Sequence, residues 1–351
     1  MLRYPLFKCA GASFFEIGRQ YGQQAKVQIA HAIADYREVF AETSSMSWEE
    51  IQKVALSYVD ITRRETPEVM EEVEGIAEGS GFSLADIMIV NCRYEITKFP
   101  KPKECTTAVV MPEAGKDGRM YLFKNWDYRV GIMDHVVIIH ITEPNGTRMV
   151  GLAEAGQVLR GGMNSFGIGL ACNNLQSIYD KWDVGLPSVF SRRQMLKMGN
   201  FADAVNWLKT FPRAVSNNMM VCSFNEKLAA DLEVYPEGTD VIEPEAGVLT
   251  HANHFIVQPQ IYALPAKSQR DARLRELLMQ ERGNIDVDYI KLCMADHVNY
   301  PQALCRHAPD PKIRLAMRTT TVATEIYDYE AGMLHVCSGQ PCCGEFRTIV
   351  L

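Results

Sequence analysis

The sequence predicts an α+β fold in which two antiparallel β-sheets pack face to face between two outer layers of helices, a four-layer αββα sandwich. Three observations lead to this prediction. The first hundred residues carry helical patterns and helix-boundary signals. The chain then changes, within Pro100–Tyr128, to β-branched and aromatic runs at hairpin spacing. Helical segments return in pairs between the later hairpins, which favours helices covering antiparallel sheets over a doubly wound parallel sheet.

Helices are predicted before the change and between the hairpins. Ser47 and Glu50 fit a capping box. Thr66-Pro67 gives a cap followed by proline at the first helical position. The predicted helices cover Phe14–Ala41, Ser47 to about Arg64, Thr66 to Gly79–Gly81, a segment opening at Ser83–Asp86, Ser188–Met198, Phe201–Phe211, Ser268–Arg282 and Asp286–Ala295.

Strands are predicted wherever β-branched and aromatic runs flank turn signals. Asp117-Gly118 lies between the runs CTTAVVM and RMYLFKNW, and Asn145-Gly146 lies between HVVIIHIT and TRMVGLAEA. Further strands are predicted at Phe166–Asn174, Asn218–Phe224, Leu228–Tyr235, Val248–Asn253, Thr319–Tyr329 and Met333–Cys337.

Composition narrows the function classes. The 351 residues are 47% hydrophobic, which allows a large core in one or two domains. The net charge of −7 and the lack of a basic run argue against a nucleic-acid partner. The longest apolar runs are far shorter than the roughly 20 residues of a membrane span, so we expect no membrane partner. The ten scattered cysteines are typical of free thiols in a reducing compartment, and we expect a cytoplasmic protein.

The cysteine and histidine spacings do not match a common metal site. The closest approaches are Cys337 with Cys342 and Cys343, and His251 with His254. Neither has two CxxC arms or an HExxH helix, so we expect no metal. A cysteine-rich redox or metal-binding protein is the interpretation that co-purifying metal would favour.

Cys105 is the strongest candidate nucleophile, because it opens a strand directly after a linker rich in lysine and proline. An ordinary thiol has a pKa of about 8.5, so little of it is thiolate at neutral pH. An α-amine on the same residue, with a pKa of about 7.7–8.0, could take the thiol proton and later return one to a leaving group. That amine exists only if the Glu104–Cys105 bond is cut, and the thiol itself could attack this carbonyl. The alternative is a buried structural thiol.

Three further side chains are candidate partners of this nucleophile. Asp127 could hold the α-ammonium group. Asn253 could donate to an oxyanion, a role worth roughly 3–4 kcal/mol of transition-state stabilisation. Arg306 could bind a carboxylate through two hydrogen bonds. The alternative for Asp127 is a solvent-exposed carboxylate at a hairpin end. For Asn253, spacing alone favours a turn position, and for Arg306 a solvent-exposed surface position fits equally well.

These residues fall within five motifs that occur in a recognisable order. The motifs are Phe15–Gly22; Cys105-Thr106-Thr107 with Asn125-Trp126-Asp127; Glu154–Gly156 with Asn164–Ile168; Thr250–His254; and Asp296 with Asn299–Pro301 and Cys305-Arg306. Together they resemble the acyl-coenzyme A:6-aminopenicillanic acid acyltransferase family, the peptidase C45 group of N-terminal nucleophile (Ntn) hydrolases. The resemblance covers most of the chain. Bile salt hydrolases and penicillin V acylases look like more distant relatives.

The resemblance implies one self-cleaving Ntn-hydrolase domain over residues 1–351. Cutting between Glu104 and Cys105 would separate a helical segment, residues 1–104, from a catalytic chain, residues 105–351. The residue roles that the resemblance implies are these: Cys105 as nucleophile, Asp127 beside its amine, Asn253 in the oxyanion hole, Arg306 supporting the nucleophile, and Asn173 on the substrate side as a second oxyanion candidate.

We therefore expect an Ntn-type cysteine amide hydrolase or acyltransferase that forms an acyl-Cys105 intermediate. Its substrate would be a small N-acyl amine or amino-acid amide, and the acyl group would pass to water or to an amine. No cofactor is expected, although a coenzyme A thioester is a candidate acyl donor. The family pattern has glycine where this chain has Glu104. This difference favours the alternative of an uncut, catalytically dormant binding protein with the Ntn fold. The oligomeric state stays open.

Overall fold

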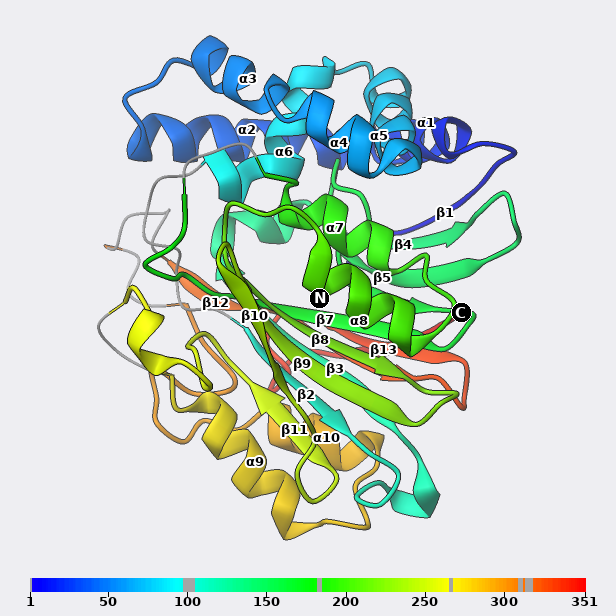
Figure 1. Cartoon of the computed structure of the whole chain (residues 1–351), viewed down its shortest axis with the longest axis vertical. Helices are drawn as coiled ribbons and strands as arrows, with labels where there is room; N and C mark the ends of the chain where they lie inside the picture. The colour runs from blue at the N-terminus through cyan, green and yellow to red at the C-terminus, as the bar shows by residue number, and fades with distance from the viewer. Residues whose placement is uncertain (1, 97–104, 182–184, 265–267, 309–311, 313–317) are drawn as a thin grey trace.

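The computed structural model describes residues 2–96, 105–181, 185–264, 268–308, 312 and 318–351. These residues form four layers, in the order helices, sheet, sheet, helices (Figure 1). The predicted four-layer αββα sandwich is therefore confirmed. Within the part of the chain that is described, none of the helices combines the length and the apolar composition needed to cross a membrane.

The first layer consists of the helices that precede β2 and those between β7 and β8 in the chain, drawn from blue to green in Figure 1. Its capping box at Ser47 and Glu50 is present, and Gly81 ends the third predicted helix in a left-handed conformation. Two predicted helices are each divided in two, at Ala25 and at Ser57-Tyr58. The helices are α1 (Phe14–Gln24), α2 (Lys26–Thr43), α3 (Trp48–Leu56), α4 (Val59–Glu65), α5 (Pro67–Ser80), α6 (Leu84–Ile96), α7 (Ser188–Met195) and α8 (Phe201–Thr210).

The eight-stranded sheet lies beneath this layer, with the strand order β1-β4-β5-β6-β7-β8-β9-β10. Neighbouring strands are antiparallel except β1 and β4, which pair in parallel. The strands are β1 (Leu6–Ala10), β4 (Val136–Thr142), β5 (Arg148–Glu154), β6 (Gly162–Asn164), β7 (Ile168–Asn174), β8 (Asn217–Ser223), β9 (Leu228–Tyr235) and β10 (Gly238–Ile242).

The six-stranded sheet packs against the first sheet and is covered on its other face by two helices. Its strand order is β11-β2-β3-β12-β13-β14. These elements are β2 (Thr106–Val110), β3 (Tyr121–Arg129), β11 (Val248–His251), β12 (Thr319–Asp328), β13 (Met333–Ser338), β14 (Phe346–Val350), α9 (Arg270–Gln280) and α10 (Val287–Met294).

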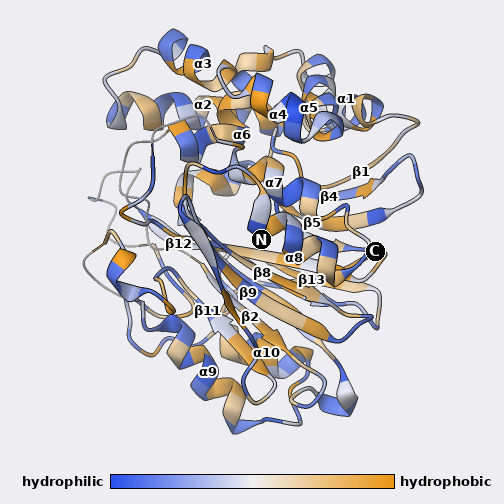
Figure 2. Ribbon diagram, in the orientation of Figure 1, coloured by the Kyte–Doolittle hydropathy of each residue, from blue (hydrophilic) through white to orange (hydrophobic). Residues whose placement is uncertain are grey.

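Three hydrophobic cores fill the spaces between the layers. In β4, Val137 and Ile139 face the first helical layer, whereas Val136 and Ile138 face the second sheet. The central strands of both sheets are thus buried on both faces, which explains why their sequences lack a regular alternation of apolar and polar residues. Figure 2 shows the same arrangement, with apolar residues concentrated on the strands and on the inner faces of the helices.

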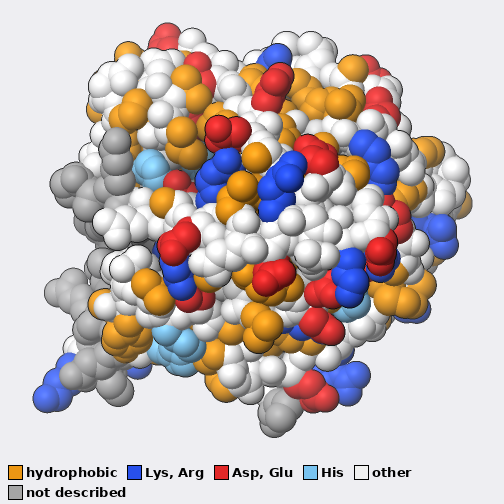
Figure 3. Space-filling view, turned by 90° about the horizontal axis from the view of Figure 1, so that it is seen from below, with side chains coloured by type: hydrophobic (Ala, Val, Ile, Leu, Met, Phe, Trp, Pro, Cys, Tyr) orange, Lys and Arg blue, Asp and Glu red, His pale blue; other side chains and the backbone are white. Residues whose placement is uncertain are grey.

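The outer surface of the last layer is mixed in charge. Arg275 pairs with Glu245, and Lys291 pairs with Asp288. On the face that Figure 3 presents, acidic and basic side chains are interspersed among apolar ones. Exposed pairs of this kind contribute little to stability, about 0–1 kcal/mol each.

Four short strands have no counterpart in the sequence prediction: β1, β6, β10 and β14. β1 pairs with β4, more than 120 residues later in the chain, with Leu6 opposite Ile138. Such distant pairing leaves no hairpin signal in the local sequence. β10 and β14 lie at the edges of their sheets and are partly exposed, so their hydrophobic patterns are weak.

Candidate active site

Cys105 and Asp127 lie next to each other because β2 and β3 form an antiparallel hairpin. Thr106 is opposite Asn125 in this pairing, which brings the start of β2 alongside the end of β3. The Cys105 Sγ atom lies 3.8 Å from the Asp127 carbonyl oxygen, and the thiol is buried. Cys105 has a φ of +83°, in the left-handed region that non-glycine residues rarely adopt.

The Asp127 carboxylate is fully buried at the centre of a hydrogen-bond network. Burial raises the pKa of Asp127, while the charges of Arg270 and Arg306 and hydrogen bonds from Thr321 and the Cys105 backbone N–H oppose the rise. Thr321 Oγ1 donates to Oδ1 at 2.6 Å, and Arg270 Nη1 lies 3.5 Å from Oδ2. The backbone nitrogen of Cys105 is therefore hydrogen-bonded to the Asp127 carboxylate. The sequence predicts the same partner for the α-amine that a cut before Cys105 would create.

Asn253 follows β11 and is held in a fixed orientation. Its Nδ2 donates to the Asn174 carbonyl oxygen at 2.9 Å, and its Oδ1 accepts from Arg270 Nη2 at 2.5 Å. These two partners fix which end of the amide is the donor. The structure thus places Asn253 in the same cluster as Cys105, linked to it through Arg270.

Arg306 reaches the cluster from the segment between α10 and β12. Its backbone N–H donates to Thr321 Oγ1 at 2.8 Å, and its carbonyl oxygen accepts from the Thr321 N–H at 3.0 Å. The same Thr321 hydroxyl donates to Asp127, so one side chain joins Arg306 to the carboxylate. The half-buried Arg306 lies close enough for its charge to oppose the burial-driven rise in the pKa of Asp127. The same charge adds to the effect of burial in lowering the pKa of Arg270.

Asn173 lies at the end of β7 and points between the two sheets. Its Nδ2 donates to Thr107 Oγ1 at 2.7 Å and to Asn218 Oδ1 at 2.8 Å. Both amide hydrogens are thus used. Its Oδ1 is buried without a hydrogen-bond partner among the described residues, so its remaining capacity is that of an acceptor. An oxyanion needs a donor, and in this conformation Asn173 offers none.

A chain of buried polar groups continues from Asn173 to the loop that carries Asn253. Asn218 donates to Asp231 at 2.6 Å, and Asp231 lies 3.8 Å from the His251 ring. His251 Nε2 contacts Glu233 at 2.9 Å. Glu233 in turn accepts from the backbone N–H groups of residues 256 and 257. The network fixes the backbone on both sides of Asn253.

Arg270 is a site residue that the sequence did not reveal. It begins α9, is 2% exposed, and donates to the Cys105 carbonyl oxygen at 3.2 Å as well as to Asn253. Burial lowers the pKa of Arg270, and the Asp127 carboxylate opposes this effect. The sequence does contain a pattern that indicates its burial, because Arg270, Leu274 and Leu278 are spaced four residues apart and lie on the buried face of α9. Within a strongly charged helix, such an arginine is expected at the surface.

Replacing Arg270 with methionine is expected to slow cutting before Cys105, and any later turnover, by about 10- to 100-fold. The reason is positional, because a misplacement of about 1 Å in a reacting group costs rate on this scale. The reaction is followed by gel and by kcat and KM. A positioning role predicts a change mainly in kcat, with partial rescue by Arg270→Lys. Arg275→Met, which alters a partly exposed arginine on the same helix, is the control. Equal rates in Arg270→Met and Arg275→Met would contradict the assignment.

The proposed cut at Glu104 lies outside the described residues, and only its Cys105 side is part of the structure. The four predicted residues Cys105, Asp127, Asn253 and Arg306 come from four different segments of the chain. Arg270 hydrogen-bonds to both Cys105 and Asn253, and Thr321 hydrogen-bonds to both Asp127 and Arg306, so these two residues connect the predicted ones. Their individual roles stay predictions.

Comparison with known proteins gives the same family as the motifs. The sequence profile of the acyl-coenzyme A:6-aminopenicillanic acid acyl-transferase family matches residues 113–342, more than half of the chain. The matched part contains Asp127, Asn253 and Arg306 and begins after Cys105. A relative from Emericella nidulans, the 40 kDa form of acyl-coenzyme A:6-aminopenicillanic-acid-acyltransferase, is 24% identical over 340 residues, which cover 93% of this chain and 90% of the relative.

Solved structures with similar folds include three amide hydrolases. A variant of the conjugated bile acid hydrolase from Clostridium perfringens is 14% identical and covers 70% of this chain and 97% of its own, with a TM-score of 0.47. A Caenorhabditis elegans N-acylethanolamine-hydrolyzing acid amidase ortholog is 15% identical, with coverages of 64% and 92% and a TM-score of 0.46. The penicillin V acylase from Agrobacterium tumefaciens is 13% identical, with coverages of 70% and 86% and a TM-score of 0.47. On the strength of the profile match, this chain belongs to the acyl-coenzyme A:6-aminopenicillanic acid acyl-transferase family.

Proposed function

We propose that this protein is a self-processing cysteine amide hydrolase or acyltransferase whose nucleophile is the N-terminal Cys105 of a cut chain. Its substrate is a small N-acyl amine or amino-acid amide, and a coenzyme A thioester is a further candidate donor. The observation that carries the proposal is the Cys105 backbone nitrogen, which hydrogen-bonds to the buried Asp127 carboxylate beside the Cys105 thiol. Cutting the preceding bond would turn this nitrogen into an amine without moving it.

Self-cleavage would begin with the Cys105 thiol. Its sulfur attacks the carbonyl carbon of residue 104, the carbon–nitrogen bond breaks, and the nitrogen gains a proton as a thioester forms. Water then hydrolyses the thioester and leaves a free thiol and a free α-amine on Cys105. The φ of +83° supports this step, because strained backbone costs about 1–3 kcal/mol and the cut releases the constraint.

Turnover would reuse the same groups. The α-amine takes the thiol proton, the sulfur attacks the substrate carbonyl, and the ammonium returns a proton to the departing amine. Asn253 and Arg270 lie at the Cys105 end of the cluster, where the amide of Asn253 is a suitable donor to the developing oxyanion. Water or a second amine then attacks the acyl-thioester. Hydrolysis and transfer share every step up to this point.

The acyl-enzyme can be tested directly by mass spectrometry. The cut protein is mixed briefly with N-acyl amino-acid anilides or acyl-coenzyme A thioesters and denatured in acid. We expect chain 105–351 to gain the mass of the acyl group and an added amine to compete with water for it. An uncut chain that never gains an acyl group with any donor would reject the enzyme and favour the dormant binding protein.

A further inference from the structure

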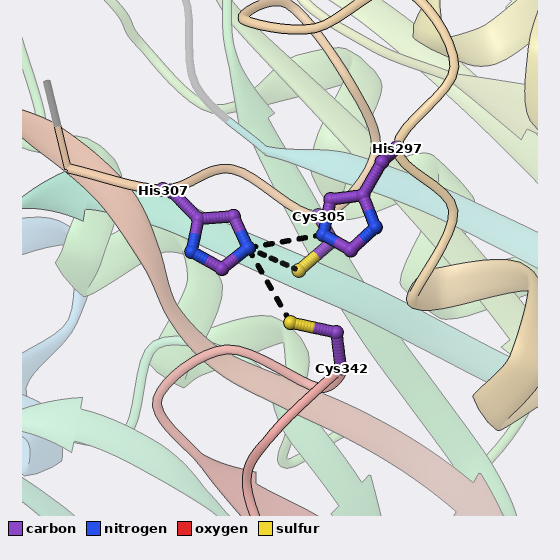
Figure 4. Close-up of side chains that lie close together, drawn as sticks. All are labelled: His297, Cys305, His307 and Cys342. Carbon is purple, nitrogen blue, oxygen red and sulfur yellow. Dashed lines mark hydrogen bonds between the residues drawn. The ribbon is translucent and has the colours of Figure 1, made fainter.

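Cys105, Asp127, Asn253, Arg270 and Arg306 are called the catalytic cluster below. Four side chains outside this cluster converge on one point (Figure 4). They are His297, Cys305, His307 and Cys342, and their four potential ligand atoms all lie within 4.8 Å of one another. The first three belong to the segment between α10 and β12, and Cys342 belongs to the loop between β13 and β14. Two segments that are distant in sequence thus each contribute soft metal ligands.

The separations of these atoms come within about 0.3 Å of those expected between ligands of a tetrahedral metal ion. His297 Nε2 lies 3.0 Å from His307 Nε2, which lies 3.4 Å from Cys342 Sγ and 3.9 Å from Cys305 Sγ. Zinc bonded to sulfur at about 2.3 Å and to nitrogen at about 2.0–2.1 Å holds its tetrahedral neighbours about 3.3–3.8 Å apart. We propose that these two cysteines and two histidines form a site for one zinc-like, borderline-soft divalent cation.

Hydrogen bonding alone does not account for the cluster. His307 Nε2 is the shared neighbour of the other three ligand atoms. One imidazole nitrogen offers either a single hydrogen or a single lone pair, so it can satisfy only one of them well. A cation at the centre would give each of the four atoms its own bond.

The ligand set indicates a structural site. Two cysteines and two histidines fill four positions and leave none open for substrate, as in closed structural zinc sites. Cys305 is buried, whereas His297 and Cys342 are exposed, so an ion could enter from solvent. The ligand spacing lacks the paired arms of common zinc motifs, which is why the sequence alone predicts no metal.

The position of the site links it to the catalytic cluster. Cys305 and His307 are the two neighbours of Arg306 in the chain. The Arg306 backbone is tied to Thr321, whose hydroxyl donates to Asp127. A bound ion would therefore fix the segment that presents Arg306 and fasten it to the β13–β14 loop. The ion would therefore position Arg306 without contacting the substrate or the reacting atoms.

Metal content tests the proposal without any substrate. The protein is reduced, loaded with Zn²⁺, desalted into metal-free buffer and analysed by inductively coupled plasma mass spectrometry. We expect about one zinc ion per chain, since the residues present supply one complete ligand set. Cys342→Ser and His297→Gln change exposed side chains and are expected to lower retained zinc at least about 10-fold. Cys343→Ser alters the adjacent exposed cysteine outside the cluster and should keep the full content.

A second measurement covers the case in which a variant does not fold. X-ray absorption of the zinc-loaded natural sequence should report two sulfur and two nitrogen ligands. Zinc-free protein after loading, an oxygen-rich shell, or equal loss in Cys342→Ser and Cys343→Ser would each overturn the proposal. A Cys305–Cys342 disulfide in protein that takes up no zinc after reduction would also overturn it and identify a redox pair instead.

Discussion

Replacing Cys105 with alanine is expected to leave one full-length chain and to remove acyl transfer and amide hydrolysis together. Alanine has no sulfur to attack either the bond before residue 105 or a substrate carbonyl. Loss of a catalytic nucleophile lowers kcat by about 10⁶-fold in a well-studied hydrolase, and a loss on this order is expected here. Intact mass under denaturing conditions reports the cut, and product release from an N-acyl anilide reports turnover.

Two further variants separate chemistry from folding. Cys105→Ser keeps a weaker nucleophile and should cut slowly instead of not at all. Cys222→Ala removes another buried thiol from the core between the sheets and should cut normally. If Cys105→Ala still yields chains 1–104 and 105–351, another group performs the cut. If the natural sequence also stays uncut, the α-amine has no place in the mechanism.

His251 is expected to be the histidine whose loss destabilises the fold most. It is fully buried, with Nδ1 2.7 Å from the Ala252 carbonyl oxygen and Nε2 2.9 Å from the Glu233 carboxylate. Both partners are acceptors, so both ring nitrogens carry hydrogens and the imidazole is charged. Burial opposes the charge, but Asp231 and Glu233 outweigh it and raise the pKa of His251 to about 9.

The sign of the pH effect follows from this raised pKa. An unfolded histidine titrates near 6.5, so the stabilisation is complete below about pH 6.5 and is lost as pH rises toward 9. A shift of this size corresponds to about 3 kcal/mol. Burial raises the pKa of Asp231 to about 6, so its own titration falls mainly below this window.

His251→Gln is therefore expected to lower the unfolding free energy by about 3 kcal/mol near pH 6.5, with a smaller loss at pH 9. Urea unfolding at several pH values measures this, in a Cys105→Ala background so that the chain stays continuous. His140→Gln is the control, because burial lowers the pKa of His140 and its titration falls below the window. A pH-independent difference, or the same slope in both variants, would show that His251 is neutral in the folded protein.

Local sequence determined most of the secondary structure and led to the choice of Cys105 as candidate nucleophile. The capping box at Ser47, the left-handed Gly81 and the hairpin of β2 with β3 depend on neighbouring residues, so a single sequence suffices to predict them. The motifs around Cys105, Asp127, Asn253 and Arg306 also lie in short stretches, and the structure brings all four residues together.

The tertiary structure alone decided which polar side chains share an environment. Arg270 contacts Cys105 only because α9 covers the second sheet. Asn173 donates both amide hydrogens to Thr107 and Asn218 because it is buried between the two sheets. Cys342 joins the His297 cluster across a gap of 45 residues in the numbering. Hydrophobic periodicity encodes which residues become buried. It does not encode which distant groups they meet, because that depends on how separate layers pack.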